Sequence, residues 1–284
     1  MCYAMNFNAD RIVLKMFKFF STPQAIATHL SQQLVEQIKT KPASVLGLAT
    51  GSTMEPIYQC LVEQLRQENT DLSQITTFNL DEYVGLGPEH PQSYHYYMYL
   101  HLFGKVPVAE ARVGLPRGKC VNLEEECRDY SRRIQDAGGL DIQLLGIGTN
   151  GHIGFNEPGT PFDSTTHVVE LSENTRLDNG RFFDDPSQMP THAITMGIRD
   201  IMQAKRIVLV ATGKHKAQVM LDLYNSPPDE TMPASILKQH PNIDIYLDED
   251  AAGLLVDTRS KVLGSHRRAQ HGHILEAEGS ITLC

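Results

Sequence analysis

The sequence predicts an α/β protein with a mostly parallel β-sheet that is covered by helices on both faces. Short apolar runs alternate with amphipathic segments along the chain, and polar segments with glycine follow several of these runs. The composition, with 41% hydrophobic and 21% charged residues, is that of an ordinary globular protein. Strands that alternate with helices at this spacing are typical of parallel sheets.

Amphipathic segments predict the helices. The first begins after Thr22, which can cap it, and has proline at the first helical position. Ile26, Leu30, Leu34 and Ile38 then recur every four residues, which predicts one buried stripe. Further helices are predicted over residues 56–67, 93–103, 124–136 and 216–224.

Short apolar runs predict the buried strands. Their length and their flanking turn residues favour strands over helices. The predicted strands cover residues 44–49, 75–80, 142–147, 206–211 and 243–247.

The chain shows no linker between two domains, so we expect a single α/β domain over residues 1–252. Residues 160–190 are polar, with prolines near both ends, and are either a mobile lid or a surface excursion. Residues 253–284 are expected to form a polar C-terminal tail. Its histidine-containing tract, 265–273, is better explained by a frayed tail than by metal binding.

Charge and cysteine usage exclude several classes of protein. The formal net charge of −9 does not suit a polyanion such as nucleic acid, although one local basic pocket can still bind a small phosphate. The five cysteines form no CxxC pair and no even-numbered disulfide framework. No apolar run approaches the ~18 residues of a membrane span, and the first twenty residues do not resemble a signal peptide. We therefore expect a cytoplasmic protein without nucleic-acid or membrane partners.

The first polar segment at a strand end contains Thr50, Gly51, Ser52 and Thr53. Ligands of open α/β sheets bind outside the carboxyl ends of the strands, and small residues before a helix let backbone N–H groups approach an anion. The segment is not a Walker A motif. A phosphate site and a plain strand–helix turn both remain open.

The second segment contains the adjacent carboxylates Asp81 and Glu82, which should point in different directions. One of them can face the cleft as a general base. The alternative for Asp81 is a loop-capping role.

The third segment, Leu145–Pro158, has four glycines within nine residues, which implies tight backbone geometry. Asn150, His152 and Glu157 lie on this one bent loop. A histidine near a carboxylate can be held in one tautomer and transfer protons near neutral pH. We favour this catalytic interpretation over a purely structural histidine.

The fourth segment places Lys214 and Lys216 before a predicted helix. Cations there oppose the helix dipole unless an anion is bound, so the pair is either a phosphate clamp or a set of solvated lysines. Together the four segments indicate an enzyme that handles a small phosphorylated molecule by proton transfer. The sequence shows no Rossmann GxGxxG, no serine nucleophile elbow and no clustered metal ligands.

Longer segments resemble the signature segments of glucosamine-6-phosphate deaminases. The similarity extends from about Ile38 to Asp248. The segments are Phe78–Leu86 (FNLDEYVGL), His90–Tyr94 (HPQSY), Gly148–Pro158 (GTNGHIGFNEP), Asn179–Phe183 (NGRFF) and His240-Pro241.

The resemblance implies a modified doubly wound, Rossmann-like fold with a lid segment and no metal or organic cofactor. It implies conversion of glucosamine 6-phosphate and water to fructose 6-phosphate and ammonia. His152 matches the ring-opening residue, Glu157 its carboxylate partner, and Asp81 the base that moves the proton on carbon 2. Asn150 stands where some members have aspartate, so it should orient the site rather than ionise.

The same resemblance implies the phosphate ligands. Lys216 and Arg181 match phosphate-binding positions, together with the backbone around Gly51, Ser52 and Thr53. The remaining functional alternatives are a galactosamine-6-phosphate deaminase/isomerase, a 6-phosphogluconolactonase and a non-catalytic sugar-phosphate sensor. The protein is expected to be a monomer or a homo-oligomer.

Some members of the family are activated by N-acetylglucosamine 6-phosphate at a second phosphate site between subunits. At the matching positions this chain has Pro161, His167 and Val169 in place of hydroxyl and basic residues, with Asp163 nearby. A phosphate dianion needs cationic or well-aimed N–H donors. We therefore predict that this activation is absent.

Overall fold

The computed structural model describes residues 15–180, 183, 185 and 188–255. Its main sheet has seven strands, which are all parallel, as the sequence predicts. In their order across the sheet, the strands are β1 (Phe17–Phe20), β10 (Ile243–Asp248), β9 (Ile207–Ala211), β6 (Ile142–Leu145), β2 (Val45–Leu48), β3 (Thr76–Asn79) and β5 (Val113–Gly114).

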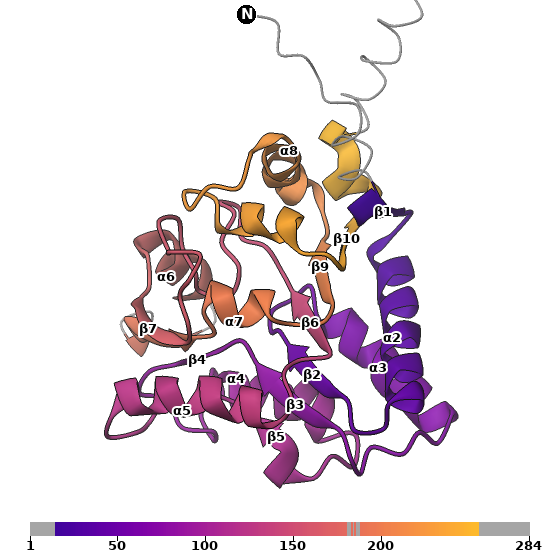
Figure 1. Cartoon of the computed structure of the whole chain (residues 1–284), viewed down its shortest axis with the longest axis vertical. Coiled ribbons are helices and arrows are strands. Elements are labelled where there is room, and N and C mark those ends of the chain that lie inside the picture. Colours follow the sequence, from indigo (N-terminus) through magenta and orange to yellow (C-terminus); the bar gives the residue numbers. More distant parts are fainter. Residues whose placement is uncertain (1–14, 181–182, 184, 186–187, 256–284) are drawn as a thin grey trace, which may run out of the picture.

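Helices cover both faces of this sheet (Figure 1). On one face, α2 (Pro23–Thr40) packs against α3 (Glu55–Gln67). On the other face lie α5 (Leu123–Asp136), α7 (Ile198–Met202) and α8 (Ala217–Asn225). The two-sided cover follows from right-handed crossovers that run in opposite directions from the middle of the sheet.

Helix α2 begins as predicted, because Thr22 Oγ1 accepts a hydrogen bond from Ala25 N at 3.1 Å. The predicted stripe is buried, and each member is at most 2% exposed. Truncation of one such leucine to alanine typically costs about 2–5 kcal/mol. The four members are Ile26, Leu30, Leu34 and Ile38.

The predicted helix over 93–103 changes type along its length. Ser93 caps α4 (Tyr94–Met98) by accepting a hydrogen bond from Tyr96 N, and the chain continues as a π-helix over Tyr99–Phe103. The 3₁₀-helices cover Glu110–Arg112, Lys214–Lys216 and Pro233–Gln239.

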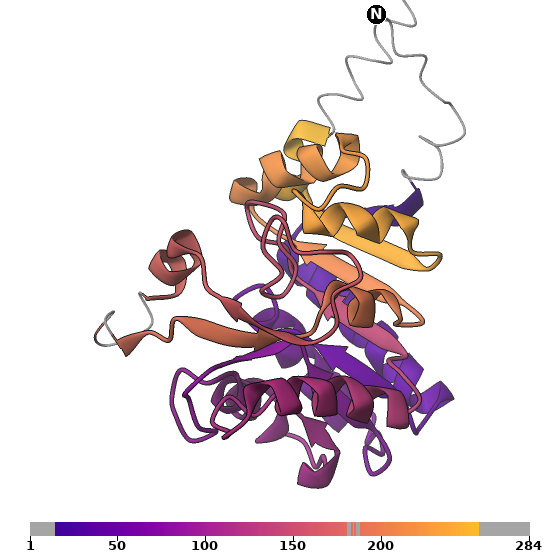
Figure 2. The ribbon, with the colours of Figure 1, turned by 60° about the vertical axis from the view of Figure 1, so that its left-hand side comes forward.

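A second, three-stranded antiparallel sheet was not predicted. It pairs β4 (Asp81–Tyr83) with β8 (His192–Thr195), and β8 with β7 (His167–Glu170). Figure 2 shows β7, β8 and the helix between them, α6 (Glu173–Gly180), as an arm beside the main sheet. The segment 160–190 therefore contains regular structure, and it contributes to a second hydrophobic cluster. This cluster comprises Tyr83, Phe155, Leu171, Phe183, Met189 and Ala193.

The two ends of the described chain differ from expectation. Strand β1 adds an edge strand beside β10 that the sequence patterns did not predict. A helix over 249–255 crosses the expected boundary at residue 252. The rest of the expected tail, with its histidine tract, lies outside the described residues. Between residues 15 and 255, as far as the structure describes them, no helix is long and apolar enough to cross a membrane.

Candidate active site

Four neighbouring strands bring the predicted segments together. Strands β9, β6, β2 and β3 are adjacent, and they are followed by the loops that contain Lys216, His152, Ser52 and Asp81. The chain moves outward from β2 to β3 and β5, and β6 then returns to the other side of β2. Such a switch in strand order leaves a crevice at the carboxyl ends of the strands. The site therefore lies at this switch point.

The loop after β2 is built to present free donors. Gly51 adopts φ +99°, and its carbonyl accepts hydrogen bonds from Met54 N and from Tyr97 Oη, both at 2.9 Å. Ser52 is exposed, and Thr50 and Thr53 are half-buried. No hydrogen bond joins these three hydroxyls to another described residue, so they can bind a ligand.

Asp81 and Glu82 have opposite roles, as expected for adjacent strand residues. The Glu82 carboxylate accepts hydrogen bonds from the backbone N–H groups of Tyr83, Tyr94 and His95 at 2.8–3.0 Å. It therefore caps the start of α4, and the capping role considered for Asp81 belongs to its neighbour. Burial raises the pKa of Glu82 to about 7, although the three N–H groups favour its ionised form.

Asp81 is the candidate base of this pair. It is 6% exposed, and burial together with the negative charge of Glu82 raises its pKa to about 8. It pairs with Thr195 on β8. A Cβ atom at Gly154 would lie 3.6 Å from Asp81 Oδ2, so the glycine-rich loop approaches this carboxylate closely. A general base with a pKa near neutrality suits proton abstraction from carbon.

The loop after β6 brings His152 and Glu157 together. Nδ1 of His152 lies 3.6 Å from Oε2 of Glu157, and the two side chains are 26% and 15% exposed. Gly148 makes room for the ring, because a Cβ atom there would lie 2.2 Å from His152 Cε1. Asn150 orients both partners: its Nδ2 donates to Glu157 Oε2 at 2.7 Å, and its Oδ1 accepts from His152 N at 3.2 Å.

Glu157 is held in its ionised form. Burial opposes ionisation, but the neighbouring His152, the Thr175 hydroxyl and the Asn150 amide outweigh it and lower the pKa of Glu157 to about 2. Thr175 Oγ1 donates to Oε1 at 2.6 Å, and Ser172 Oγ lies 3.1 Å from the same oxygen. A permanent carboxylate next to an accessible imidazole is a suitable arrangement for proton transfer to a sugar ring oxygen.

Lys216 links two of the loops. Its Nζ donates to the carbonyl of Ile147 at 2.7 Å, which places the ammonium group at the end of β6. Gly213, with φ +86°, is fixed by hydrogen bonds from its N–H to the buried carboxylate of Asp248. The second predicted phosphate ligand, Arg181, lies outside the described residues. Among the side chains that the structure describes, no group of three or more His, Cys, Asp and Glu could hold a metal ion.

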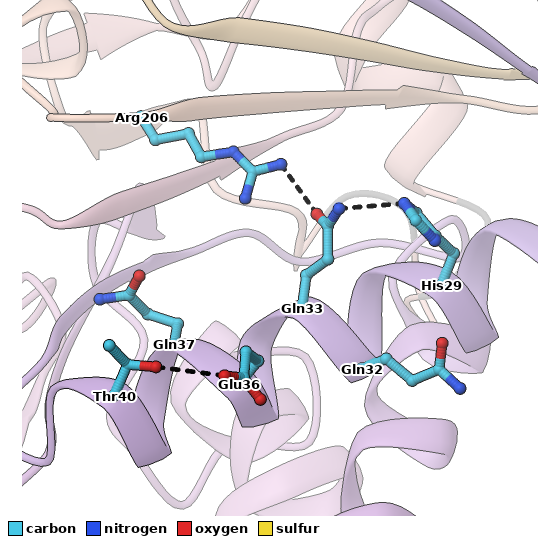
Figure 3. A pocket seen from close by; sticks show the side chains of 7 residues that line it. All are labelled: His29, Gln32, Gln33, Glu36, Gln37, Thr40 and Arg206. Atoms are coloured by element: carbon cyan, nitrogen blue, oxygen red, sulfur yellow. Dashed lines mark hydrogen bonds between the residues drawn. The ribbon is translucent and has the colours of Figure 1, made fainter.

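An open groove of about 440 Å³ lies elsewhere, between α2 and the start of β9 (Figure 3). Its Arg206 is already bound by Gln33 and Asp244. The groove lies at the amino end of β9, away from the loops described above, so we do not place the substrate there.

Comparison with known proteins decides the family. A family model for glucosamine-6-phosphate isomerases and 6-phosphogluconolactonase matches residues 21–245. The chain belongs to this family. Among curated relatives, the glucosamine-6-phosphate deaminase of Rhodopirellula baltica is 53% identical over 222 residues, which cover 78% of this chain and 88% of that protein. The glucosamine-6-phosphate deaminase of Geobacillus sp. is 49% identical over 229 residues, which cover 81% of this chain and 91% of that protein.

Solved structures agree with the family. A monomeric glucosamine-6-phosphate deaminase has a TM-score of 0.82 at 43% identity, over 84% of this chain and 99% of that one. The 6-phosphogluconolactonase of Trypanosoma brucei has a TM-score of 0.66 at 18% identity, over 84% and 97% of the two chains. At that identity the second match reflects the shared fold alone.

Ser172, Thr175 and Asp248 were missed by the sequence analysis. Ser172 accepts a hydrogen bond from Thr175 N at 3.2 Å at the start of α6. A serine before an acidic first turn is a signal for a helix start that could have located it. Nothing in the sequence connects these hydroxyls to Glu157, because the contact depends on how the arm folds back.

Proposed function

We propose that the protein is a glucosamine-6-phosphate deaminase, which converts glucosamine 6-phosphate and water to fructose 6-phosphate and ammonia. The observation that supports this most strongly is the placement of a buried carboxylate, Asp81, against the loop that contains the His152–Glu157 pair. Ring opening and proton transfer at carbon 2 need these two functions side by side.

Ring opening is the first task of the site. His152, supported by ionised Glu157 and oriented by Asn150, takes the proton of the hydroxyl on carbon 1 and delivers a proton to the ring oxygen as the bond between carbon 1 and that oxygen breaks. The pyranose then becomes an open-chain aldehyde. The phosphate at carbon 6 binds to Lys216 and Arg181 and to the donors of the loop that contains Thr50, Gly51, Ser52 and Thr53.

Deamination follows from one proton shift. Asp81 removes the proton from carbon 2, and the resulting enol-type intermediate takes up a proton at carbon 1. Carbon 1 is thereby reduced to a hydroxymethyl group, while the C–N bond at carbon 2 becomes an imine. Water adds to the imine, and ammonia leaves as the ketone forms. No external oxidant or reductant is required.

The test is an assay of ammonia and ketose-phosphate release from glucosamine 6-phosphate. The same preparation is offered galactosamine 6-phosphate and 6-phosphogluconolactone. We expect ammonia and ketose phosphate in equal amounts from the first compound, with lower kcat/KM for its epimer. Hydrolysis of the lactone without ammonia release from either amino sugar would contradict the proposal.

A further inference from the structure

Two hydroxyl groups from outside the catalytic loop bind the Glu157 carboxylate. Thr175 Oγ1 donates to Oε1 at 2.6 Å, and Ser172 Oγ lies 3.1 Å from the same oxygen. Ser172 precedes α6 and Thr175 lies in its first turn. The other carboxylate oxygen, Oε2, is bound by Asn150. Both oxygens of Glu157 are therefore occupied, one from within the loop and one from the arm.

Thr175 is the main hydrogen-bond donor to Oε1 of Glu157. Ser172 Oγ accepts a hydrogen bond from Thr175 N at 3.2 Å and lies 2.9 Å from Thr175 Oγ1. The single hydroxyl proton of Ser172 can therefore go to either Glu157 or Thr175. Thr175, at 2.6 Å, has the shorter contact to the carboxylate, and hydrogen bonds to a charged acceptor are the stronger kind.

The start of α6 is held in a fixed place. Leu171 N donates to the carbonyl of Thr191 at 2.8 Å, which ties this turn to the small sheet. Leu171 is 4% exposed and belongs to the same hydrophobic cluster as Phe155, two residues before Glu157. The turn that carries the two hydroxyls is therefore positioned by the same small sheet that contains Asp81 on β4.

We propose that Thr175, supported by Ser172, is a positioning residue for ring opening: it fixes the Glu157 carboxylate so that His152 is aligned only when α6 is in place. This inference rests on the proposed function. His152 Nδ1 makes no hydrogen bond to any described residue, and the carboxylate 3.6 Å away is the neighbour that can orient it. Release of Oε1 would let Glu157 rotate away from the imidazole, whereas the residues that bind the phosphate or move the carbon-2 proton would be unchanged.

The experiment compares Thr175→Val, which removes the hydroxyl at nearly constant volume, with Thr175→Ser, which retains it. We expect kcat on glucosamine 6-phosphate to fall about 10-fold to 100-fold in Thr175→Val, the loss of one hydrogen bond to a charged group. KM should change less than about threefold, because the ground-state ligands remain. Thr175→Ser should restore most of the turnover. Affinity for 2-amino-2-deoxyglucitol 6-phosphate, which has no ring to open, should stay within about threefold of the unmodified protein.

Thr160→Val is the matched control. The Thr160 hydroxyl donates to the backbone carbonyl of Glu157 at 2.7 Å and does not touch the carboxylate. Its turnover should stay within about twofold of the unmodified protein. Ser172→Ala provides the second variant if Thr175→Val gives no folded protein, with a smaller expected loss.

Three results would overturn the inference. They are unchanged kcat in both Thr175→Val and Ser172→Ala, an equal loss in Thr160→Val, and a fall in affinity for the acyclic phosphate that parallels the fall in kcat. If the unmodified protein releases no ammonia, the proposed function fails. If it does, and both Thr175→Val and Ser172→Ala match it, only the positioning role fails.

Discussion

Asp81 faces Thr195 across the antiparallel strands β4 and β8, so the carboxylate that we propose as the base belongs to the small sheet. The seven-stranded sheet supplies the loops of Ser52, His152 and Lys216. The site is thus assembled from two sheets, and the carboxylate is buried where they meet.

Asp81→Asn should keep substrate binding and lose most turnover. An amide cannot accept the carbon-2 proton, and removal of a general base typically costs about 10²–10⁴-fold in rate. The measurements are kcat for glucosamine 6-phosphate and affinity for a non-reacting analogue. Near-normal turnover in a folded Asp81→Asn protein would refute the assignment of the base.

The same substitution should stabilise the fold above neutral pH. The pKa of Asp81 is raised to about 8 in the folded protein from an ordinary value of 3.8. The folded state therefore binds more protons than the unfolded state between these values, and the free energy of unfolding falls as the pH rises through this window. Asp81→Asn removes that loss. The thermal unfolding midpoint of Asp81→Asn should be higher than that of the unmodified protein, and the difference should grow from pH 5 to pH 8. A difference that stays constant over this range would contradict the raised pKa.

Lys216→Ala should mainly raise KM. The phosphate is bound in both the ground and transition states, so loss of its ligand weakens both. We expect an increase of about 10-fold or more, typical of a lost hydrogen bond to a charged group. Lys214→Ala, two residues away and exposed, is the matched control.

Arg181→Ala should behave like Lys216→Ala, with a further effect on kcat if residues 160–190 close over the substrate. Equal rates with glucosamine and its 6-phosphate would disprove the phosphate clamp.

Gly148→Ala should displace the His152 ring and lower kcat. The added methyl group would lie 2.2–2.4 Å from three ring atoms, so the ring must leave its present position beside Glu157. We expect a loss of about 10-fold to 100-fold, because misplacement of a catalytic group by about 1 Å has this effect. Gly146→Ala, in the same loop, adds a methyl group that meets nothing within 4 Å. An equal loss in both variants would attribute the effect to the loop as a whole.

Substrate saturation should be hyperbolic, with no activation by N-acetylglucosamine 6-phosphate. His167 Nδ1 lies 2.8 Å from the carbonyl of Thr165, and Val169 packs against the second hydrophobic cluster, so neither side chain stands in for the lysine or arginine that the resemblance places at these positions. Saturation curves with and without the acetylated compound, at constant ionic strength, check this. A sigmoidal curve that becomes hyperbolic on its addition would contradict the prediction.

Most of the main sheet could be predicted from the sequence, because buried parallel strands are continuous apolar runs. The runs 44–49 and 206–211 contain β2 and β9, which are buried at every position. The small sheet could not be predicted. Strand β4 has only three residues, Asp81–Tyr83, and two of them are acidic. Its pairing with β8 depends on contacts between distant parts of the chain.

The candidate site divides in the same way. The glycine-rich frame predicted the pairing of His152 with Glu157, because the two residues lie five positions apart on one loop. Thr175 lies outside that loop, and its contact with Glu157 arises only when α6 is placed by the small sheet. Local patterns identify the groups that do chemistry, whereas the groups that hold them depend on tertiary structure.

The order of synthesis gives the pairing of β1 with β10 a consequence for folding. Phe17 is among the first described residues to leave the ribosome, and its partner Ile245 is among the last. The pairing of β1 with β10 therefore forms late. Pairings between parts of the chain that are so far apart also slow folding. Asp81 likewise acquires its buried environment only after Thr195 has been synthesised. Pairings between distant parts of the chain also form slowly when the complete chain refolds. Recovery of activity during refolding should therefore lag behind recovery of helical signal, because the proposed base Asp81 is buried only after β4 has paired with β8.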